Sequence, residues 1–541
     1  MAGPYDPSAE VFDYAQQTMS CLSKQTLGCI QCYSCVARAV GHHCCFQGMR
    51  YFPVTKEGLL AGPPEFRTPA EPDDEPDWNA KRLTAALTPQ IADEIKVSMA
   101  KQVLPMVQAE HDHATPKVGH SPVKTRLDLT GSLTCDTCLV NMPSASWMCT
   151  SCGRESCPAC REALIAIEEL EARDPGVTLT YEQQRRKKCI AKKRGSIGPA
   201  GWSHNSSQFA PLTKYSEAQL GEIHRDVEAH AASQPAGAGG GLTDDQVAGL
   251  YHMFETRKRP HDALEDHRPV IRIDASQVAD PVAGLKYFES VWARGEPVCI
   301  TGCLSECPAE WTPEQIVARL GKTECHLVQL ATQALTPSTF ADFFGAFSRP
   351  KLDPVHNYKL LEFSAADLDQ LLPGLAGAYQ DRLPLGDLLR TNGVRNLGAH
   401  TPPNAVLPDF GPRLHAAFGG GESALYDVVA STLLKREVAD VANLMLYGGE
   451  NPTKPLAGKP GFARWDIFRH EDVPAVLGFL HEMLSKKTKQ TAERYAETHD
   501  DPLLCQQHCF PPVKLLELRE RGIRPFTIWQ KPGDVVLVPS G

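Results

Sequence analysis

Short apolar runs dominate the chain from about residue 269 onward, and they alternate with segments of helical periodicity. The segment "WTPEQIVARLG" predicts a helix, because Thr312 is a favoured N-cap residue, Pro313 suits the first turn and Gly321 follows the last apolar position. Many short strands without regular βαβ alternation favour an antiparallel sandwich or barrel with added helices. The apolar runs that predict strands are "PVIRI", "PVCITG", "HLVQL", "YKLLEF", "LYDVVA", "ANLMLY", "FTIW" and "DVVLV".

The first half of the chain has a different pattern, in which cysteine clusters are separated by polar segments. "SEAQLGEIHRDVE" predicts a helix with a capping box formed by Ser216 and Gln219. Leu220, Ile223 and Val227 form its apolar stripe. The acidic, proline-rich "EPDDEPD" and the glycine-rich "ASQPAGAGGG" predict linkers. We therefore predict a multidomain protein: an N-terminal Cys-rich module (1–60), a linker (61–125), a second Cys-rich module (126–215), a helix with a Gly/Ala linker (216–268) and a mainly-β domain (269–541).

Length and charge limit the possible classes of protein. A chain of 541 residues is too long for one compact core, which agrees with several domains. The formal net charge of −10 gives no global preference for nucleic acid, so basic character has to be local. The N-terminus lacks the basic start and apolar run of a secretory signal. No uncharged apolar stretch reaches the roughly 18 residues that span a bilayer. We therefore expect a soluble, intracellular protein without membrane contact.

Thirteen of the 19 cysteines precede residue 190, and most of them form Cys-x2-Cys pairs. In a reducing compartment such pairs favour a tetrahedral metal over disulfides. Three pairs within residues 135–160 supply six ligands, which fill one zinc site and half of another. Cys189 and His204 are the nearest downstream residues that could complete the second site. We expect an interleaved arrangement, with one zinc held by Cys135, Cys138, Cys157 and Cys160 and the other by Cys149, Cys152, Cys189 and His204.

A less regular cysteine block lies near the N-terminus. Cys29, Cys32 and Cys35 could hold one further zinc ion together with one of Cys21, Cys44 or Cys45. Our predicted set is Cys29, Cys32, Cys35 and Cys44. The alternative is a group of free buried thiols, which pack as small apolar side chains.

The segment "RRKKCIAKKR" (185–194) contains seven basic residues in ten. Such a run predicts a nuclear localisation signal or a patch that contacts DNA phosphates. A solvated surface is the alternative. Since the run lies within the Cys-rich block, we favour nuclear import or contact with DNA phosphates through 185–194 over a solvated surface.

Residues from about 295 onward resemble the catalytic domain of JmjC histone lysine demethylases. The resemblance starts at "PVCITG" and "WTPE" and continues through "DRLPLGDLL", "NLGAHTPPN", "DVANLMLYGG", "WDIFRHEDVP" and "IWQKPGDVVLVPSG", some 240 residues in the family's order. The last two motifs are similar to the branch that acts on lysine 9 of histone H3. That branch also carries an upstream Cys-rich zinc module, as this chain does.

The resemblance implies a double-stranded β-helix (a jelly-roll of the JmjC and cupin type) with added helices. It also implies oxidative removal of methyl groups from lysine, with Fe(II) and 2-oxoglutarate as cofactors and the histone H3 tail in chromatin as partner. In the family, iron is held by two histidines and one carboxylate. The implied location is the nucleus.

The motif that should carry the first two iron ligands departs from the family pattern. Counted back from "DVANLMLY", Lys435 takes the histidine position and Glu437 the carboxylate position. Glu437 could still bind iron, whereas a lysine ammonium has no lone pair near neutral pH. We expect Lys435 to pair with Glu437 instead. Other histidines of the domain are expected to serve other roles; they are His400, His415, His470 and His508.

The family's distal histidine follows a segment like "VPSG", at which the printed sequence ends, so we expect this ligand and the closing strands to be missing. Three hypotheses remain. The chain is an active demethylase whose sequence is incomplete or locally wrong, a folded but non-catalytic chromatin scaffold, or a truncated fragment that folds poorly.

Overall fold

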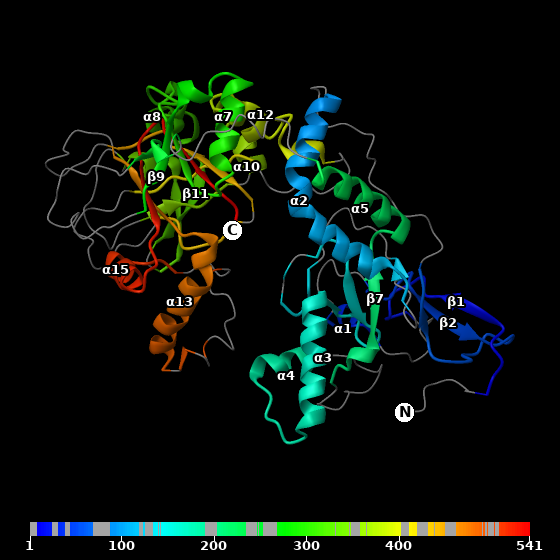
Figure 1. The fold of residues 1–541 in the computed structure, drawn as a ribbon. Helices are drawn as coiled ribbons and strands as arrows, with labels where there is room; N and C mark the ends of the chain where they lie inside the picture. The colour runs from blue at the N-terminus through cyan, green and yellow to red at the C-terminus, as the bar shows by residue number, and fades with distance from the viewer. Residues whose placement is uncertain are drawn as a thin grey trace. The chain divides into compact units, whose positions relative to one another are not determined.

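The computed structural model divides the chain into two compact units, residues 1–236 with 401–406, and residues 237–400 with 407–541 (Figure 1). The residues that it describes are 8–23, 31–37, 44–68, 87–117, 123–124, 134–138, 140, 142–189, 203–233, 246, 248–252, 268–330, 332–345, 347, 358–363, 365–401, 411–418, 431–437, 439–449, 461–489, 491–492, 495, 503 and 508–541.

Two small sheets support the cysteine clusters of the first unit. One sheet has the order β1-β2-β3 and the other the order β4-β7-β5-β6. The strands are β1 (Asp13–Gln16), β2 (Arg50–Val54), β3 (Glu65–Phe66), β4 (Val123–Lys124), β5 (Ser146–Cys149), β6 (Glu155–Ser156) and β7 (Phe209–Thr213).

One hydrophobic cluster contains residues from both Cys-rich modules. Phe46, which precedes β2, packs in it with Met148 of β5 and Leu212 of β7. Cys21, Cys32 and Cys35 belong to the same cluster. The two modules therefore share a core, and the prediction of separate domains is corrected, because small cysteine-rich units bury little apolar surface alone.

The range 61–125, which we predict as linker, contains the 26-residue helix α2 (Pro89–Ala114). Thr88 caps it by accepting the N–H of Ile91. The helix lies along α5 (Glu217–Ala231), and Lys96 of α2 pairs with Asp226 of α5 at 2.9 Å (Figure 1). The linker prediction is wrong for this segment because packing against a distant helix stabilises it. The acidic run 71–77 lies outside the described residues.

Helix α5 confirms the predicted capping box, since the Ser216 hydroxyl accepts the N–H of Gln219 and the Gln219 side-chain oxygen accepts the N–H of Ser216. Its predicted stripe holds only in part. Leu220 is buried, whereas the side chain of Ile223 is 43% exposed. The other helices of this unit are α1 (Tyr33–Ala37), α3 (Pro158–Arg173) and α4 (Tyr181–Lys187).

The second unit is built around a five-stranded sheet of order β14-β17-β10-β9-β8, with a three-stranded sheet β12-β11-β13 and a pair β15-β16. Seven of the eight predicted strand runs form strands; the eighth, "LYDVVA", lies outside the described residues. The strands are β8 (Tyr251–His252), β9 (Val270–Asp274), β10 (Val298–Thr301), β11 (Glu324–Gln329), β12 (Leu335–Thr339), β13 (Tyr358–Leu360), β14 (Val441–Leu444), β15 (Ala463–Ile467), β16 (Phe526–Gln530) and β17 (Val535–Val538).

Most strand pairs of this unit are antiparallel, as predicted, but β9 and β10 run parallel. Among the described strands the three sheets are separate, so a closed double-stranded β-helix stays a prediction. The added helices are α7 (Ala283–Trp292), α8 (Pro313–Leu320), α9 (Phe340–Gly345), α10 (Ala365–Leu371), α11 (Leu375–Gln380), α12 (Gly386–Leu389), α13 (Val473–Thr488) and α15 (Pro512–Glu520).

Helix α8 confirms the sequence signals at both of its ends. Thr312 accepts the N–H of Gln315, Pro313 opens the helix and Gly321 follows it. Ile316 and Leu320 of this helix are buried in a cluster that contains both aliphatic and aromatic side chains. In the part of the chain that the structure describes, no helix combines the length and the apolar composition needed to cross a membrane.

Candidate metal centres

The first group of sulfur atoms lies where helix α3 begins. Cys157 is the N-cap of α3 and Cys160 lies in its first turn, while Cys135 and Cys138 lie in a turn that precedes β5. All four sulfurs lie within 4.8 Å of one another. The N–H of Cys157 donates to the Cys135 sulfur at 3.3 Å. A hydrogen bond from Cys160 lowers the pKa of Cys135 to about 3, which favours the thiolate that zinc requires.

The second group combines Cys149 at the end of β5 with Cys152, Cys189 and His204. All four are buried, and their ligand atoms lie within 4.8 Å of one another. Burial lowers the pKa of His204, so its imidazole stays neutral and can donate a lone pair to a metal. The structure thus brings together both interleaved sets that the sequence predicts.

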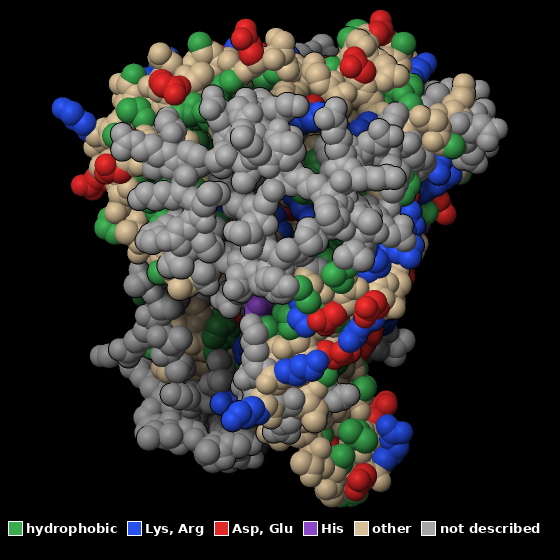
Figure 2. Space-filling model, turned by 90° about the vertical axis from the view of Figure 1, so that its left-hand side faces the viewer, with side chains coloured by type: hydrophobic (Ala, Val, Ile, Leu, Met, Phe, Trp, Pro, Cys, Tyr) green, Lys and Arg blue, Asp and Glu red, His purple; other side chains and the backbone are tan. Residues whose placement is uncertain are grey.

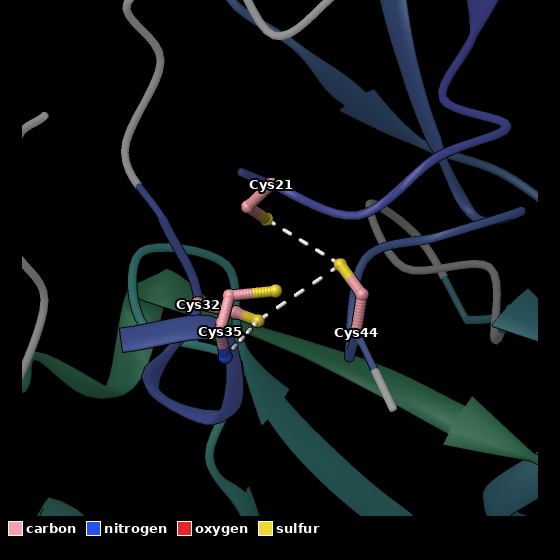
Figure 3. Close-up of side chains that lie close together, drawn as sticks. All are labelled: Cys21, Cys32, Cys35 and Cys44. Carbon is pink, nitrogen blue, oxygen red and sulfur yellow. Dashed lines mark hydrogen bonds between the residues drawn. The ribbon is translucent and has the colours of Figure 1, made fainter. Parts of the chain in front are cut away.

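The third group differs from the predicted one. Cys21, Cys32, Cys35 and Cys44 place their sulfurs within 4.8 Å of one another (Figure 3). Cys32 and Cys35 come from one turn at helix α1, while Cys21 and Cys44 approach from other segments (Figure 3). Cys21, which the sequence leaves open as an alternative to Cys44, joins the predicted Cys32, Cys35 and Cys44. Cys29 lies outside the described residues, so its part in the site stays a prediction.

The sulfur separations in two of the groups match those expected around zinc. Zn–S bonds of about 2.3 Å in a tetrahedron place neighbouring sulfurs roughly 3.8 Å apart. The distance is 3.8 Å between Cys138 and Cys157, 3.9 Å between Cys32 and Cys44, and 3.4 Å between Cys21 and Cys44. Thiolate-rich sites of this kind suit zinc and do not suit Mg²⁺ or Ca²⁺.

Direct contacts join the third group to the other two. The N–H of Tyr33 donates to the carbonyl of Cys152 at 2.7 Å, and its hydroxyl donates to Asp136 at 3.0 Å. Tyr33 therefore links the turn that carries Cys32 with loops of both other groups. The three groups form one continuous assembly.

The basic run 185–194 is described only in its first half. Lys187, at the end of α4, forms an ion pair with Glu171 of α3, and the side chain of Lys188 is exposed. The remaining basic residues, Lys192 to Arg194, lie outside the described residues. On the face that Figure 2 shows, the described Lys and Arg side chains are interspersed with Asp and Glu.

In the second unit, Lys435 and Glu437 precede strand β14. The Lys435 ammonium lies 2.7 Å from a carboxylate oxygen of Glu437, as the sequence predicts. Among the described residues, no group of three His, Cys, Asp or Glu donors includes Glu437. The ammonium of Lys435, which is paired with the only carboxylate predicted to bind iron, repels a divalent ion. These residues therefore do not fit an Fe(II) site.

The histidines of this unit have other contacts. His400 bonds to the carbonyl of Val394 at 2.7 Å, and His470 lies 3.4 Å from the carbonyl of Gly541. The backbone carbonyl of His508 accepts the N–H of Leu434 at 2.7 Å. None of them belongs to a described metal-ligand group.

A second carboxylate close to Lys435 is Glu362. His415 lies 3.2 Å from it, while Lys359 and Arg413 both lie 3.7 Å away. The hydrogen bond to His415, with the charges of His415, Lys359 and Lys435, lowers the pKa of Glu362 to about 2 from its usual 4.5.

We expect Glu362 to stabilise the fold above pH 4.5 and to lose this contribution as the pH falls toward 2. The contribution is lost at low pH because the pKa of Glu362 is lower in the folded than in the unfolded chain. With solvent screening, the full contribution is on the order of 2 kcal/mol.

Urea unfolding of wild type and Glu362→Gln between pH 2 and 6 measures this contribution. The difference in unfolding free energy should shrink below pH 4.5, and for the exposed Glu324→Gln control it should stay near zero. A pH-independent difference for Glu362→Gln contradicts the prediction.

No family model matches the chain. Among curated proteins, lysine-specific demethylase 3A of Mus musculus is 25% identical over 319 residues, which cover 52% of this chain and 23% of the relative. The Homo sapiens protein of the same name is 25% identical over 318 residues. The probable JmjC domain-containing histone demethylation protein 2C of Homo sapiens is 25% identical over 291 residues, 47% of this chain and 11% of the relative. The matches span about a quarter or less of these relatives. The predicted resemblance to JmjC-domain histone lysine demethylases is confirmed.

Proposed function

We propose that this relative of the JmjC-domain histone lysine demethylases acts at chromatin as a zinc-binding scaffold that does not itself remove methyl groups. Its partner is the histone H3 tail around lysine 9. The zinc groups of the first unit provide a rigid surface, and the second unit keeps the family's domain for binding rather than for catalysis.

The Lys435–Glu437 ion pair carries this proposal. By resemblance, these two positions should supply a histidine nitrogen and a carboxylate to iron. A protonated lysine offers no lone pair, and at 2.7 Å from Glu437 it neutralises the carboxylate that remains. An iron ion bound here would have to displace this ammonium. The displaced ammonium of Lys435 would then remain beside the iron as an uncompensated charge, which is unfavourable at a partly buried site.

The second candidate function is histone H3 lysine 9 demethylation with Fe(II) and 2-oxoglutarate. The resemblance from "PVCITG" to "DVVLVPSG" favours it. It requires a ligand set other than the one that the resemblance assigns.

The test is an assay of the full chain with Fe(II), 2-oxoglutarate and an H3 peptide methylated at lysine 9. We expect the peptide to bind, as measured by fluorescence anisotropy, without release of succinate or formaldehyde. Turnover above the metal-free background overturns the proposed loss of catalysis, and failure to bind the peptide overturns the proposed scaffold.

A pair of variants tests the role of Lys435 independently of turnover. Lys435→His restores a nitrogen donor beside Glu437, so we expect binding of Co²⁺ at this site to tighten at least tenfold, by isothermal titration of zinc-loaded protein. Arg436→His is the matched control, because it adds the same imidazole one position away, where alternate side chains point to opposite sides of an extended chain. Equal Co²⁺ affinities for the two variants contradict this assignment.

We further propose a nuclear location, with the run 185–194 as import signal and as a contact for DNA phosphates. Its support is the density of basic residues, of which Lys188 is exposed.

A further inference from the structure

A fully buried arginine lies beside the third sulfur group. Arg50, the first residue of β2, is 1% exposed. Its guanidinium carbon lies 4.6 Å from the ring centre of Phe46 and 5.1 Å from that of Phe52. A guanidinium stays protonated at any pH that proteins encounter, so the core of this module contains a permanent positive charge.

The hydrogen bonds of Arg50 lead to the sulfur atoms. Its Nη2 donates to the Cys21 sulfur at 3.6 Å, and its Nε donates to the side-chain oxygen of Gln17 at 2.7 Å. The amide nitrogen of Gln17, which is also 1% exposed, lies 3.4 Å from the sulfur of Cys44 and 3.7 Å from that of Cys21. Two buried side chains thus direct N–H groups at two of the four sulfurs.

The charge of the sulfur group decides whether this arrangement is favourable. Burying a cation next to four neutral thiols is unfavourable, because neutral sulfur is a weak acceptor and the two aromatic faces offset only part of the lost hydration. A divalent zinc with four thiolates has a formal net charge of about −2, and it attracts a neighbouring guanidinium. Hydrogen bonds from outer groups also orient metal ligands and tune their affinity.

We infer that Cys21, Cys32, Cys35 and Cys44 form a tetrathiolate zinc site and that Arg50 compensates its charge, with Gln17 orienting Cys21 and Cys44. The inference does not depend on the catalytic state of the second unit. It also distinguishes this site from the group with His204, where a neutral imidazole replaces one thiolate and the formal charge is smaller.

Three substitutions in the full chain test the inference. Arg50→Met removes the charge and keeps an apolar side chain, whereas Arg50→Lys keeps the charge. Arg67→Met is the matched control. Arg67 follows β3 of the same sheet and its guanidinium carbon lies 3.6 Å from the ring centre of Tyr14, but its side chain is 43% exposed.

Elemental analysis should give three zinc ions per wild-type chain. With a chromogenic chelator, we expect Arg50→Met to release its first zinc ion at least tenfold faster than wild type. Arg50→Lys should be intermediate, and Arg67→Met should match wild type. The inference is overturned if the wild-type chain contains only two zinc ions, or if Arg50→Met releases all three ions at the wild-type rates.

Cadmium-113 NMR of the substituted wild-type protein keeps the test decisive if Arg50→Met does not fold. We expect three resonances, two in the range of four thiolates and one in the range of three thiolates and a nitrogen. A missing second four-thiolate resonance rejects the site.

Discussion

Removal of zinc should unfold the unit that contains residues 1–236 and leave the unit that contains residues 268–400 and 411–541 folded. The cores of the first unit are built largely from the ligands themselves, since Cys149, Cys152 and Cys189 make up most of one buried cluster and Cys135, Cys157 and Cys160 most of another. Structural zinc contributes about 10–16 kcal/mol per ion in small domains, whereas the net stability of a domain is about 5–15 kcal/mol. The free energy lost with even one zinc ion therefore exceeds the net stability of the unit.

Hydrogen exchange with mass spectrometry, before and after treatment with a strong chelator, measures this effect for each segment. We expect β5, β7 and α3 to lose protection, because they carry or contact the ligands. Strands β9, β10 and β17 provide the internal control, since their core consists of aliphatic side chains such as Ile271, Val298 and Val535. Protection of β5 and β7 that survives complete removal of metal contradicts the prediction.

The sequence predicts the zinc groups well wherever a single turn fixes the geometry. Two cysteines three positions apart bind one ion because one tight turn carries both. This rule finds four pairs without any tertiary information: Cys32–Cys35, Cys135–Cys138, Cys149–Cys152 and Cys157–Cys160. The ligand count predicts the need for two further ligands such as Cys189 and His204, because six ligands cannot fill two sites. It does not determine which pairs share an ion, which depends on the fold.

Ligands that the fold alone brings together are harder to predict. Cys21 is eleven positions before Cys32, so no local turn joins them, and only the packing of Phe46 and β2 places its sulfur in the group. Arg50 gives no signal in the sequence, because a single arginine in a strand is usually exposed. Helix α2 could not be predicted because Pro105 interrupts its pattern and few of its side chains, among them Ala100 and Val107, are buried.

In the second unit, the sequence predicts the strand runs and the ends of α8 because both depend on neighbours in the chain. It also predicts the pairing of Lys435 with Glu437, since opposite charges two positions apart in an extended segment lie on the same side. The charges around Glu362 could not be predicted, because His415 and Lys359 come from segments that only the fold brings together.

Substitution of Gly153 by alanine should destabilise the zinc-loaded first unit by about 2–5 kcal/mol. Gly153 has a φ of +77°, where a side chain costs roughly 1–2 kcal/mol. An added Cβ would also lie 2.8 Å from the Cβ of Cys45 and 3.0 Å from that of Cys32. Neither neighbour can move freely, since Cys32 belongs to the third sulfur group and Cys45 follows Cys44 of the same group. Overpacking of this kind adds about 1–3 kcal/mol.

Gly58→Ala separates the two contributions, because Gly58 has nearly the same φ of +76° but no heavy atom within 4 Å of an added Cβ. It should cost only the backbone strain, roughly 1–2 kcal/mol. Chemical denaturation of the zinc-loaded variants gives both values, and zinc release kinetics give a second readout. Since Gly153 follows the ligand Cys152 and contacts the ligand Cys32, its alanine variant should release zinc from two groups faster, whereas Gly58→Ala should release it at the wild-type rate. Equal losses of stability in the two variants would mean that close packing of Gly153 against Cys32 and Cys45 contributes nothing, which contradicts the prediction.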